Sequence, residues 1–113
     1  MKTKFEMTMK IATELLTYCH LHGADDFHLD IKVEQEAAFY VIKASPVSIS
    51  DKELERVIKL LNAPRQRDIE QDYWELMGES SEFCELTLIG MLSDSSTVEI
   101  TDGVMTITLF RSS

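Results

Sequence analysis

The sequence predicts an α+β fold, a two-layer sandwich in which helices cover one face of a mixed sheet. Two pairs of amphipathic strands are separated by helical segments, and each strand pair has its apolar side chains on one side. The helices carry apolar stripes that can cover those sides. The length of 113 residues and the 44% hydrophobic content suit one globular domain, residues 1–113.

The first expected element is a helix from about Lys4 to His22, followed by Gly23 as a C-terminal stop. Its apolar side consists of Ile11, Ala12, Leu15, Leu16 and Cys19. Apolar and polar residues then alternate strictly over Phe27–Val33, which predicts a half-buried strand. The segment AAFYVIKAS, which begins at Ala37, is rich in β-branched and aromatic residues and predicts a second strand.

Three helical segments are expected in the middle of the chain. Ser50 and Glu53 form a capping box that opens a helix running to about Leu61. Beyond Pro64, residues 65–77 form a charged helical stretch, and residues 82–92 predict a mostly buried helix.

The chain closes with a predicted hairpin. Residues 97–101 and 104–110 flank Asp102-Gly103, a dipeptide typical of two-residue hairpin turns. Such a turn places Ile100 opposite Met105 and Val98 opposite Ile107, so that the apolar residues share one face.

Composition excludes several functional classes. The net charge of −9, from 20 acids and 11 bases, repels phosphate backbones, so we expect no nucleic-acid partner. No apolar run approaches the roughly 20 residues of a membrane helix, so we expect no membrane partner. The N-terminus does not have the pattern of a secretory signal, and two cysteines without a CxxC motif indicate neither a disulfide framework nor structural zinc. We therefore expect a cytoplasmic protein.

Cys19, His20 and His22 lie within four positions, which raises the question of a metal site or a catalytic pair. On a helix, Cys19 falls in the middle of the apolar arc, His22 at its edge and His20 on the opposite side. A metal site needs three or four converging ligands, and a catalytic cysteine needs exposure. We therefore expect Cys19 in the core and no metal.

A second group on this helix, Glu14, Tyr18 and His22, is spaced four residues apart and lines one flank beside the apolar arc. This flank either faces a groove above the sheet or is a solvated helix edge.

Several segments together suggest a family. ELLTYCHLHG (residues 14–23) resembles the N box of the histidine-kinase-like ATPase (GHKL) superfamily, with matches at Glu14, Leu15, Leu16, His22 and Gly23. FYVIKASPVSI (39–49) is similar to the family's strands with an Asp-x-Gly-x-Gly box, and residues 83–111 to its second glycine box, buried helix and terminal hairpin. The chain is nearest in size to sensor histidine kinase ATP-binding domains and anti-sigma-factor kinases. The resemblance implies a pocket for ATP and Mg²⁺.

The chain departs from the family at the residues that hold nucleotide. Tyr18 stands where the family has its Mg²⁺-binding Asn, and Ala44 where it has its adenine-binding Asp. Pro46 and Ser48 replace the two glycines of the first box, and Phe83–Glu85 contains no glycine. Glu14 remains as a residual base, but one base without a metal or nucleotide site does not make an enzyme. The resemblance thus implies a fold that is retained and an ATP site that is lost.

We therefore expect a regulatory, pseudokinase-like module without a cofactor. Its partner would be a protein, either a second copy in a homodimer or a signalling regulator. The expected contact surface contains the hot-spot residue types Tyr and Trp and consists of Ile69, Tyr73, Trp74 and Met77; alternatively, Trp74 packs in the core. Two other functions stay open: a genuine ATP-binding histidine or serine kinase, of two-component or anti-sigma type, with a divergent pocket, and an unrelated α+β scaffold.

Overall fold

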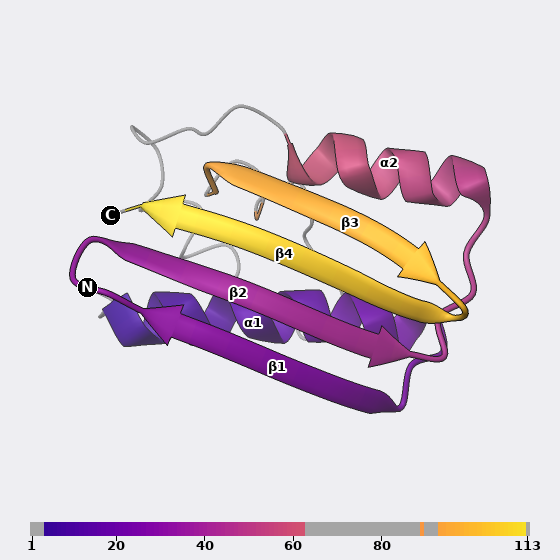
Figure 1. Ribbon diagram of the computed structural model, residues 1–113, viewed down its shortest axis with the longest axis horizontal. Coiled ribbons are helices and arrows are strands. Elements are labelled where there is room, and N and C mark those ends of the chain that lie inside the picture. Colours follow the sequence, from indigo (N-terminus) through magenta and orange to yellow (C-terminus); the bar gives the residue numbers. More distant parts are fainter. Residues whose placement is uncertain (1–3, 63–88, 90–92, 113) are drawn as a thin grey trace.

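The computed structural model describes residues 4–62, 89 and 93–112 (Figure 1). In chain order its elements are α1 (Lys4–Leu21), β1 (Asp26–Val33), β2 (Ala37–Ser45), α2 (Asp51–Leu61), β3 (Ser95–Thr101) and β4 (Val104–Ser112). Each of these elements was predicted from the sequence, with ends that differ by at most two residues.

The four strands form one sheet in the order β1-β2-β4-β3, and every neighbouring pair is antiparallel. The expected mixed sheet is therefore wrong for the described strands. Tight turns join β1 to β2 and β3 to β4, and a tight turn can join only antiparallel strands. The remaining contact, between β2 and β4, is antiparallel as well, because β4 runs back along β2 from Ala44↔Met105 to Ala37↔Ser112.

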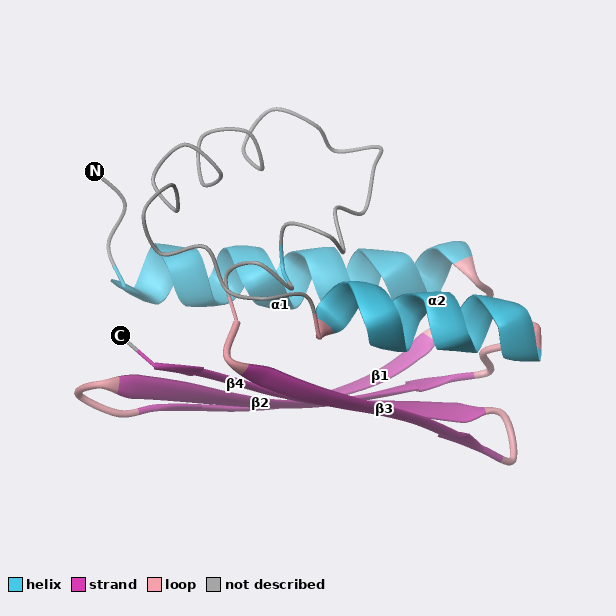
Figure 2. Cartoon of the chain, turned by 90° about the horizontal axis from the view of Figure 1, so that it is seen from above, coloured by secondary structure: helices cyan, strands magenta, loops and turns pink. Residues whose placement is uncertain are grey.

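Both helices lie on the same face of the sheet, and the opposite face carries no helix from the described residues (Figure 2). This arrangement confirms the predicted two-layer α+β architecture. α1 packs on β2, and α2 packs on the edge strand β3. Among the helices of the described residues, none is both long and apolar enough to span a membrane.

The core lies between the two layers and is richest over the central strands. Residues from both helices meet the inner faces of β2 and β4, and most of these side chains have no solvent-exposed surface. The largest fully buried side chains are Ile11, Leu15, Tyr40, Ile42, Leu61, Ile89, Met105, Ile107 and Leu109. Burial of this apolar surface is the main source of stability.

The hairpin of β3 and β4 confirms the predicted register. Asp102 and Gly103 both have positive φ, 53° and 79°, as a type I′ turn requires. Ile100 pairs with Met105 and Val98 with Ile107. The apolar residues consequently share the face that the helices cover.

β1 differs from its prediction as a half-buried strand. Its alternation does place the apolar residues on the inner face, since Leu29 pairs with Ile42. However, 40% of Leu29 is exposed, whereas Ile42 is fully buried. The reason is that α1 packs on β2, so the edge strand lies outside the helical cover.

Two predicted helices, over 65–77 and 82–92, lie outside the described residues with one exception. Ile89 is helical and fully buried, as the prediction of a buried helix over 82–92 requires.

Candidate functional site

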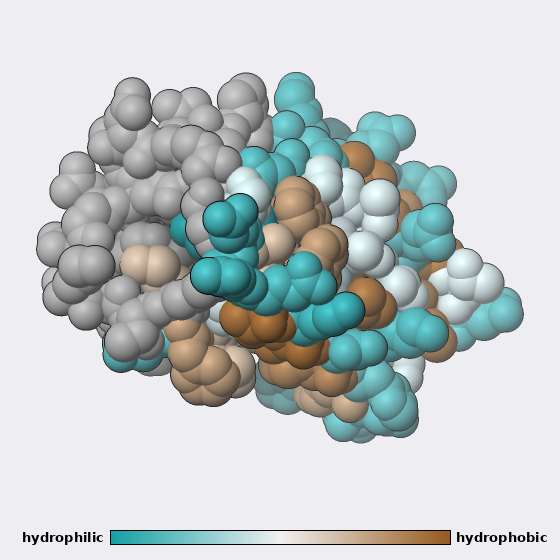
Figure 3. Space-filling model, turned by 60° about the vertical axis from the view of Figure 1, so that its left-hand side comes forward, coloured by the Kyte–Doolittle hydropathy of each residue, from teal (hydrophilic) through white to brown (hydrophobic). Residues whose placement is uncertain are grey.

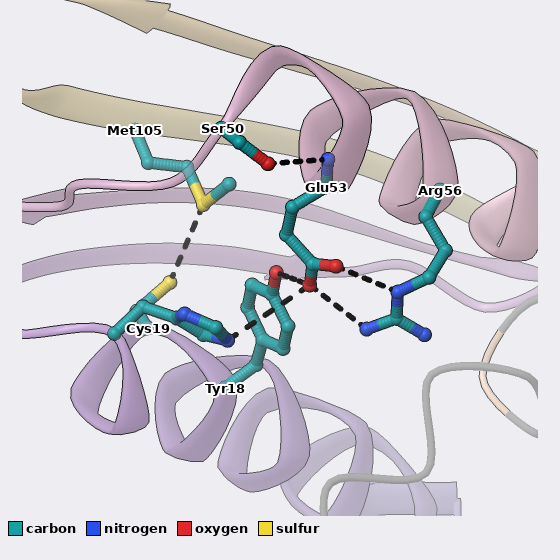
Figure 4. A network of polar contacts seen from close by, with 7 residues as sticks. Tyr18, Cys19, Ser50, Glu53, Arg56 and Met105 are labelled. Atoms are coloured by element: carbon teal, nitrogen blue, oxygen red, sulfur yellow. Dashed lines mark hydrogen bonds and ion pairs between the residues drawn. The ribbon is translucent and has the colours of Figure 1, made fainter.

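The flank of α1 that carries Glu14, Tyr18 and His22 faces the second helix. Tyr18 is only 3% exposed, and its hydroxyl donates a hydrogen bond of 2.6 Å to Glu53 Oε2 of α2 (Figure 4). Glu14 is buried one helical turn before Tyr18. A solvated helix edge is therefore the wrong interpretation of this flank.

Glu53 lies in the first turn of α2 and connects three side chains. Arg56 donates two hydrogen bonds to the carboxylate of Glu53, from Nε to Oε1 at 2.7 Å and from Nη2 to Oε2 at 2.8 Å. This bidentate geometry is the strongest form of the Arg–carboxylate pair. The oxygen that accepts from Tyr18 also accepts from Arg56 Nη2, so the carboxylate joins α1 to α2.

The predicted capping box forms in part. Ser50 is the N-cap of α2, and its hydroxyl accepts a hydrogen bond of 3.0 Å from the backbone N–H of Glu53. The Glu53 carboxylate itself binds Tyr18 and Arg56. The second half of a capping box would need that carboxylate at the Ser50 backbone N–H.

His22 completes the cluster at the C-terminal end of α1. Its ring lies against the ring of Tyr18, with centroids 4.4 Å apart, and its Nε2 is 3.9 Å from Glu53 Oε2. Tyr18, His22, Glu53 and Arg56 together are called the interhelix bridge below.

The electrostatics of the bridge favour an ionised Glu53. The hydrogen bonds from Arg56 and then from Tyr18 lower the pKa of Glu53 to about 2. The same carboxylate raises the pKa of Arg56. A general base works best with a pKa near the operating pH, so Glu53 is suited to holding the two helices together and poorly suited to proton transfer.

Cys19 lies in the core, as predicted. It is fully buried, and burial raises the pKa of its thiol to about 11. The Sγ atom lies 3.9 Å from Met105 Sδ on β4. Because a catalytic cysteine reacts as its thiolate, this position does not favour catalysis.

The two histidines close to Cys19 point to other partners. His20 Nδ1 is 2.9 Å from the carbonyl oxygen of Ala24, and its ring lies 6.4 Å from that of Phe27. His22 belongs to the interhelix bridge. The described part of the chain contains no group of three or more His, Cys, Asp or Glu side chains arranged to hold a metal ion.

The resemblance would place a first glycine box at the end of β2 and in the loop between β2 and α2. Ala44 is buried at the end of β2, and Pro46 and Ser48 are exposed. The backbone N–H of Val47 donates to the carbonyl oxygen of Gly103 at 2.8 Å, and that of Ser48 to His22 at 3.4 Å. These amides bind the protein's own carbonyl groups, whereas a phosphate cradle needs its amides directed at the ligand.

Several predicted site residues lie outside the described residues. They are Ile69, Tyr73, Trp74, Met77 and the segment Phe83–Glu85. Their placement in a contact surface, the core or a second glycine box stays a prediction.

Sequence reasoning missed Glu53 and Arg56 as members of the site. Their spacing of three on one helix was a usable signal for an ion pair. No signal in the sequence pointed to Tyr18 as the partner of Glu53. Tyr18 lies 35 residues before Glu53, and only the packing of the helices brings the two residues together.

Comparison of the chain with protein-family models, with curated proteins and with solved structures found no match.

Proposed function

We propose that this chain is a degenerate histidine-kinase-like domain that has lost ATP binding and works as a regulatory protein-binding module. The interhelix bridge is the observation that carries the proposal. Tyr18 stands at the position of the family's Mg²⁺-binding Asn, and its hydroxyl donates a hydrogen bond to the carboxylate of Glu53 on α2. A phenol held in this way has no amide oxygen to offer a metal ion.

The order of the described elements supports the same proposal. The resemblance implies a helix with the N-box motif, two strands that lead to the first glycine box, and a closing hairpin. α1, β1 with β2, and β3 with β4 follow this order along the chain.

Two features, one at the end of β2 and one in the loop after it, argue against a nucleotide site there. Ala44 offers a methyl group where an adenine amino group would need an acceptor, and an unpaired buried polar group costs about 1–3 kcal/mol. The N–H groups of Val47 and Ser48 donate hydrogen bonds to carbonyl groups of the hairpin turn and of the turn that follows α1. A phosphate would have to break both contacts.

Nucleotide binding is the first test. A ligand at 100 times its dissociation constant stabilises a protein by about 2.7 kcal/mol, which raises the melting temperature of a domain of this size by several degrees. We expect millimolar Mg-ATP to produce no such rise. A clear, magnesium-dependent rise would instead support a genuine ATP-binding kinase with a divergent pocket.

Tyr18→Asn is the matched variant, because it restores the amide that the family carries. Mg-ATP stabilisation that appears in this variant, and not in the wild type, would support descent from an ATP-binding domain. If neither protein responds, the change at Tyr18 alone does not account for the absence of binding.

Partner capture is the second test. The tagged chain is incubated with extract of its native host, and retained proteins are identified beside those retained by a Tyr73→Ala/Trp74→Ala variant. We expect a retained protein that the variant fails to bind while its melting temperature is unchanged. Equal retention by both proteins would remove this segment as the contact surface.

A further inference from the structure

Among the described strands β1 pairs only with β2, and its other edge lacks several of the features that protect an edge strand. β1 pairs with β2 without interruption from Asp26↔Ser45 to Val33↔Ala38, so it has no bulge. Its sequence, DFHLDIKV, contains neither proline nor glycine, and no charged residue lies on its inner face. A long, regular, amphipathic edge of this kind is a template for pairing with another strand.

The backbone groups that face this free edge belong to the apolar residues. The N–H of Glu34 donates to the carbonyl of Ala37 at 2.8 Å, which makes Glu34 and Ala37 a hydrogen-bonded pair. Because such pairs alternate along an antiparallel ladder, the even-numbered residues of β1 bond to β2. The N–H and C=O groups of Phe27, Leu29 and Ile31 therefore point away from β2, toward the side on which no described strand pairs with β1.

An exposed apolar surface accompanies this edge. Phe27, Leu29 and Val33 are each 38–45% exposed on the inner face of β1. On α1, which runs antiparallel to β1, Phe5 is 66% exposed and Met9 is 38% exposed. In the space-filling view, apolar side chains gather on the side of the molecule where β1 and α1 lie (Figure 3).

We propose that β1 pairs with β1 of a second copy of the chain, antiparallel and about a two-fold axis at Leu29. In this register Leu29 lies opposite Leu29, and Phe27 lies opposite Ile31 of the second copy. The two sheets become one continuous sheet of eight described strands, with both helical layers on the same face. The interface is isologous, since each chain contributes the same surface.

The polar side chains on the outer face of β1 favour pairing with a second copy in this register. Within one chain Lys32 lies 3.3 Å from Glu34 and His28 lies 3.6 Å from Asp26, so each contact across the junction would add to an existing one. With Leu29 at the axis, Asp26 lies opposite Lys32 and His28 opposite Asp30, and each contact occurs twice. An axis at Asp30 would place Asp30 opposite itself and His28 opposite Lys32. An axis at His28 would place Asp26 opposite Asp30. Opposite charges directly across a strand pair are favourable, and like charges are unfavourable.

The pairing of faces restricts the register further. Moving the axis by half a residue would bring apolar inner-face residues against the charged outer-face residues. Moving it to Ile31 would place Asp26 opposite Glu36 and leave Phe27 opposite Gln35, beyond the end of β1. The register at Leu29 is thus the one that matches both faces along the whole strand.

The same arrangement covers the exposed flank of α1. The two-fold axis is perpendicular to the sheet, so the two α1 helices flank the junction on one side of it. Phe5 and Met9 of each chain then lie beside the inner face of the new β1–β1 pair. This inference rests on β1 and α1 alone and does not depend on the proposed function.

Sedimentation velocity over a range of protein concentrations tests whether β1 forms a dimer interface. We expect the wild type to sediment as a dimer, and Leu29→Lys to raise the dissociation constant by at least about 100-fold, because a buried lysine would face its symmetry mate. Leu29 is already partly exposed, so the variant should fold, which its circular dichroism checks. Thr97→Lys, on the exposed outer face of β3, is the control and should leave the dimer intact.

A charge exchange tests the register. Lys32→Asp should raise the dissociation constant on the order of 10-fold, because two attractive contacts with Asp26 become repulsive. The double variant Asp26→Lys/Lys32→Asp should restore wild-type affinity. A monomeric wild type, or a Leu29→Lys variant that still dimerises, would overturn the proposal that β1 forms the dimer interface. Failure of the double variant to recover would overturn the register at Leu29.

Discussion

The two edges of the sheet have similar strands but different surroundings. β1 and β3 are both amphipathic, and each pairs with one neighbour. Val98 on the inner face of β3 is 8% exposed, whereas Val33 on the inner face of β1 is 45% exposed. The difference arises because α2 packs on β3, while α1 packs on the second strand from the other edge. An apolar strand face is therefore buried only where a helix lies directly above it.

α2, the helix that covers β3, is capped at its start and bonded to α1. α2 buries Val57 and Leu61 and is capped by Ser50. Its Glu53 carboxylate reaches Tyr18 on α1, so the two helices are held to each other as well as to the sheet. At the other edge of the sheet, the ring of His20 on α1 lies 6.4 Å from the ring of Phe27 on β1.

The largest expected effect contrasts two residues that face each other across β1 and β2. Ile42→Ala should lower the free energy of unfolding by about 2–5 kcal/mol, because it opens a cavity in the core. Leu29→Ala should cost the monomer less than about 1 kcal/mol, since much of its side chain is already in water. Urea denaturation at low protein concentration measures both. Equal losses would mean that β1 is covered in solution.

A matched pair of valines compares the two edges directly. Val98→Ala should lower the free energy of unfolding by about 2 kcal/mol, because it removes buried methyl groups under α2. Val33→Ala should cost less than about 0.5 kcal/mol in the monomer, since Val33 is nearly half exposed. If the two variants lose the same unfolding free energy, the difference in exposure between the two edges does not produce a difference in stability.

The bridge that ties α2 to α1 should contribute about 1–2 kcal/mol, which Tyr18→Phe removes with the hydrogen bond to Glu53. Its pH dependence follows from the lowered pKa of Glu53. The folded-state pKa is about 2 and the ordinary value is 4.5, so this stabilisation is complete above pH 4.5 and is lost as the pH falls toward 2.

Glu53→Gln is the control for that pH dependence. The difference in unfolding free energy between wild type and Glu53→Gln should shrink steadily as the pH falls from 4.5 toward 2. Chemical denaturation at a series of pH values measures it. A difference that stays constant across this range would show that the Glu53 charge does not stabilise the bridge.

The smallest expected effect concerns the turn that closes β3 onto β4. Gly103→Ala should cost about 1 kcal/mol, because Gly103 has a φ of 79° and an alanine there is strained. A Cβ atom at this position would meet no other atom within 4 Å, so strain is the whole of the cost. Hydrogen exchange should accelerate in β3 and stay unchanged in β1. Acceleration in both strands would indicate that the two edges open together.

Part of the site was predictable from spacing alone. The four-residue interval of Glu14, Tyr18 and His22 indicated a shared flank, and the structure buries Glu14 and Tyr18 there. The partner of Tyr18 was not predictable, because the capping-box pattern assigned Glu53 to the local backbone. Tyr18 and Arg56 both bind this carboxylate, and Tyr18 can reach it only because the packing of the two helices brings α1 close to α2.

The sequence by itself determined the type of each described element and the face on which its apolar side chains lie. These properties follow from local rules: the 3.6-residue period of α1, the two-residue period of β1 and the two positive φ angles at Asp102-Gly103. The tertiary structure alone decided that β1 is exposed, that β3 is covered and that Glu53 meets Tyr18. Each of these outcomes depends on where a helix rests on the sheet, which is set by packing summed over residues distant in the chain.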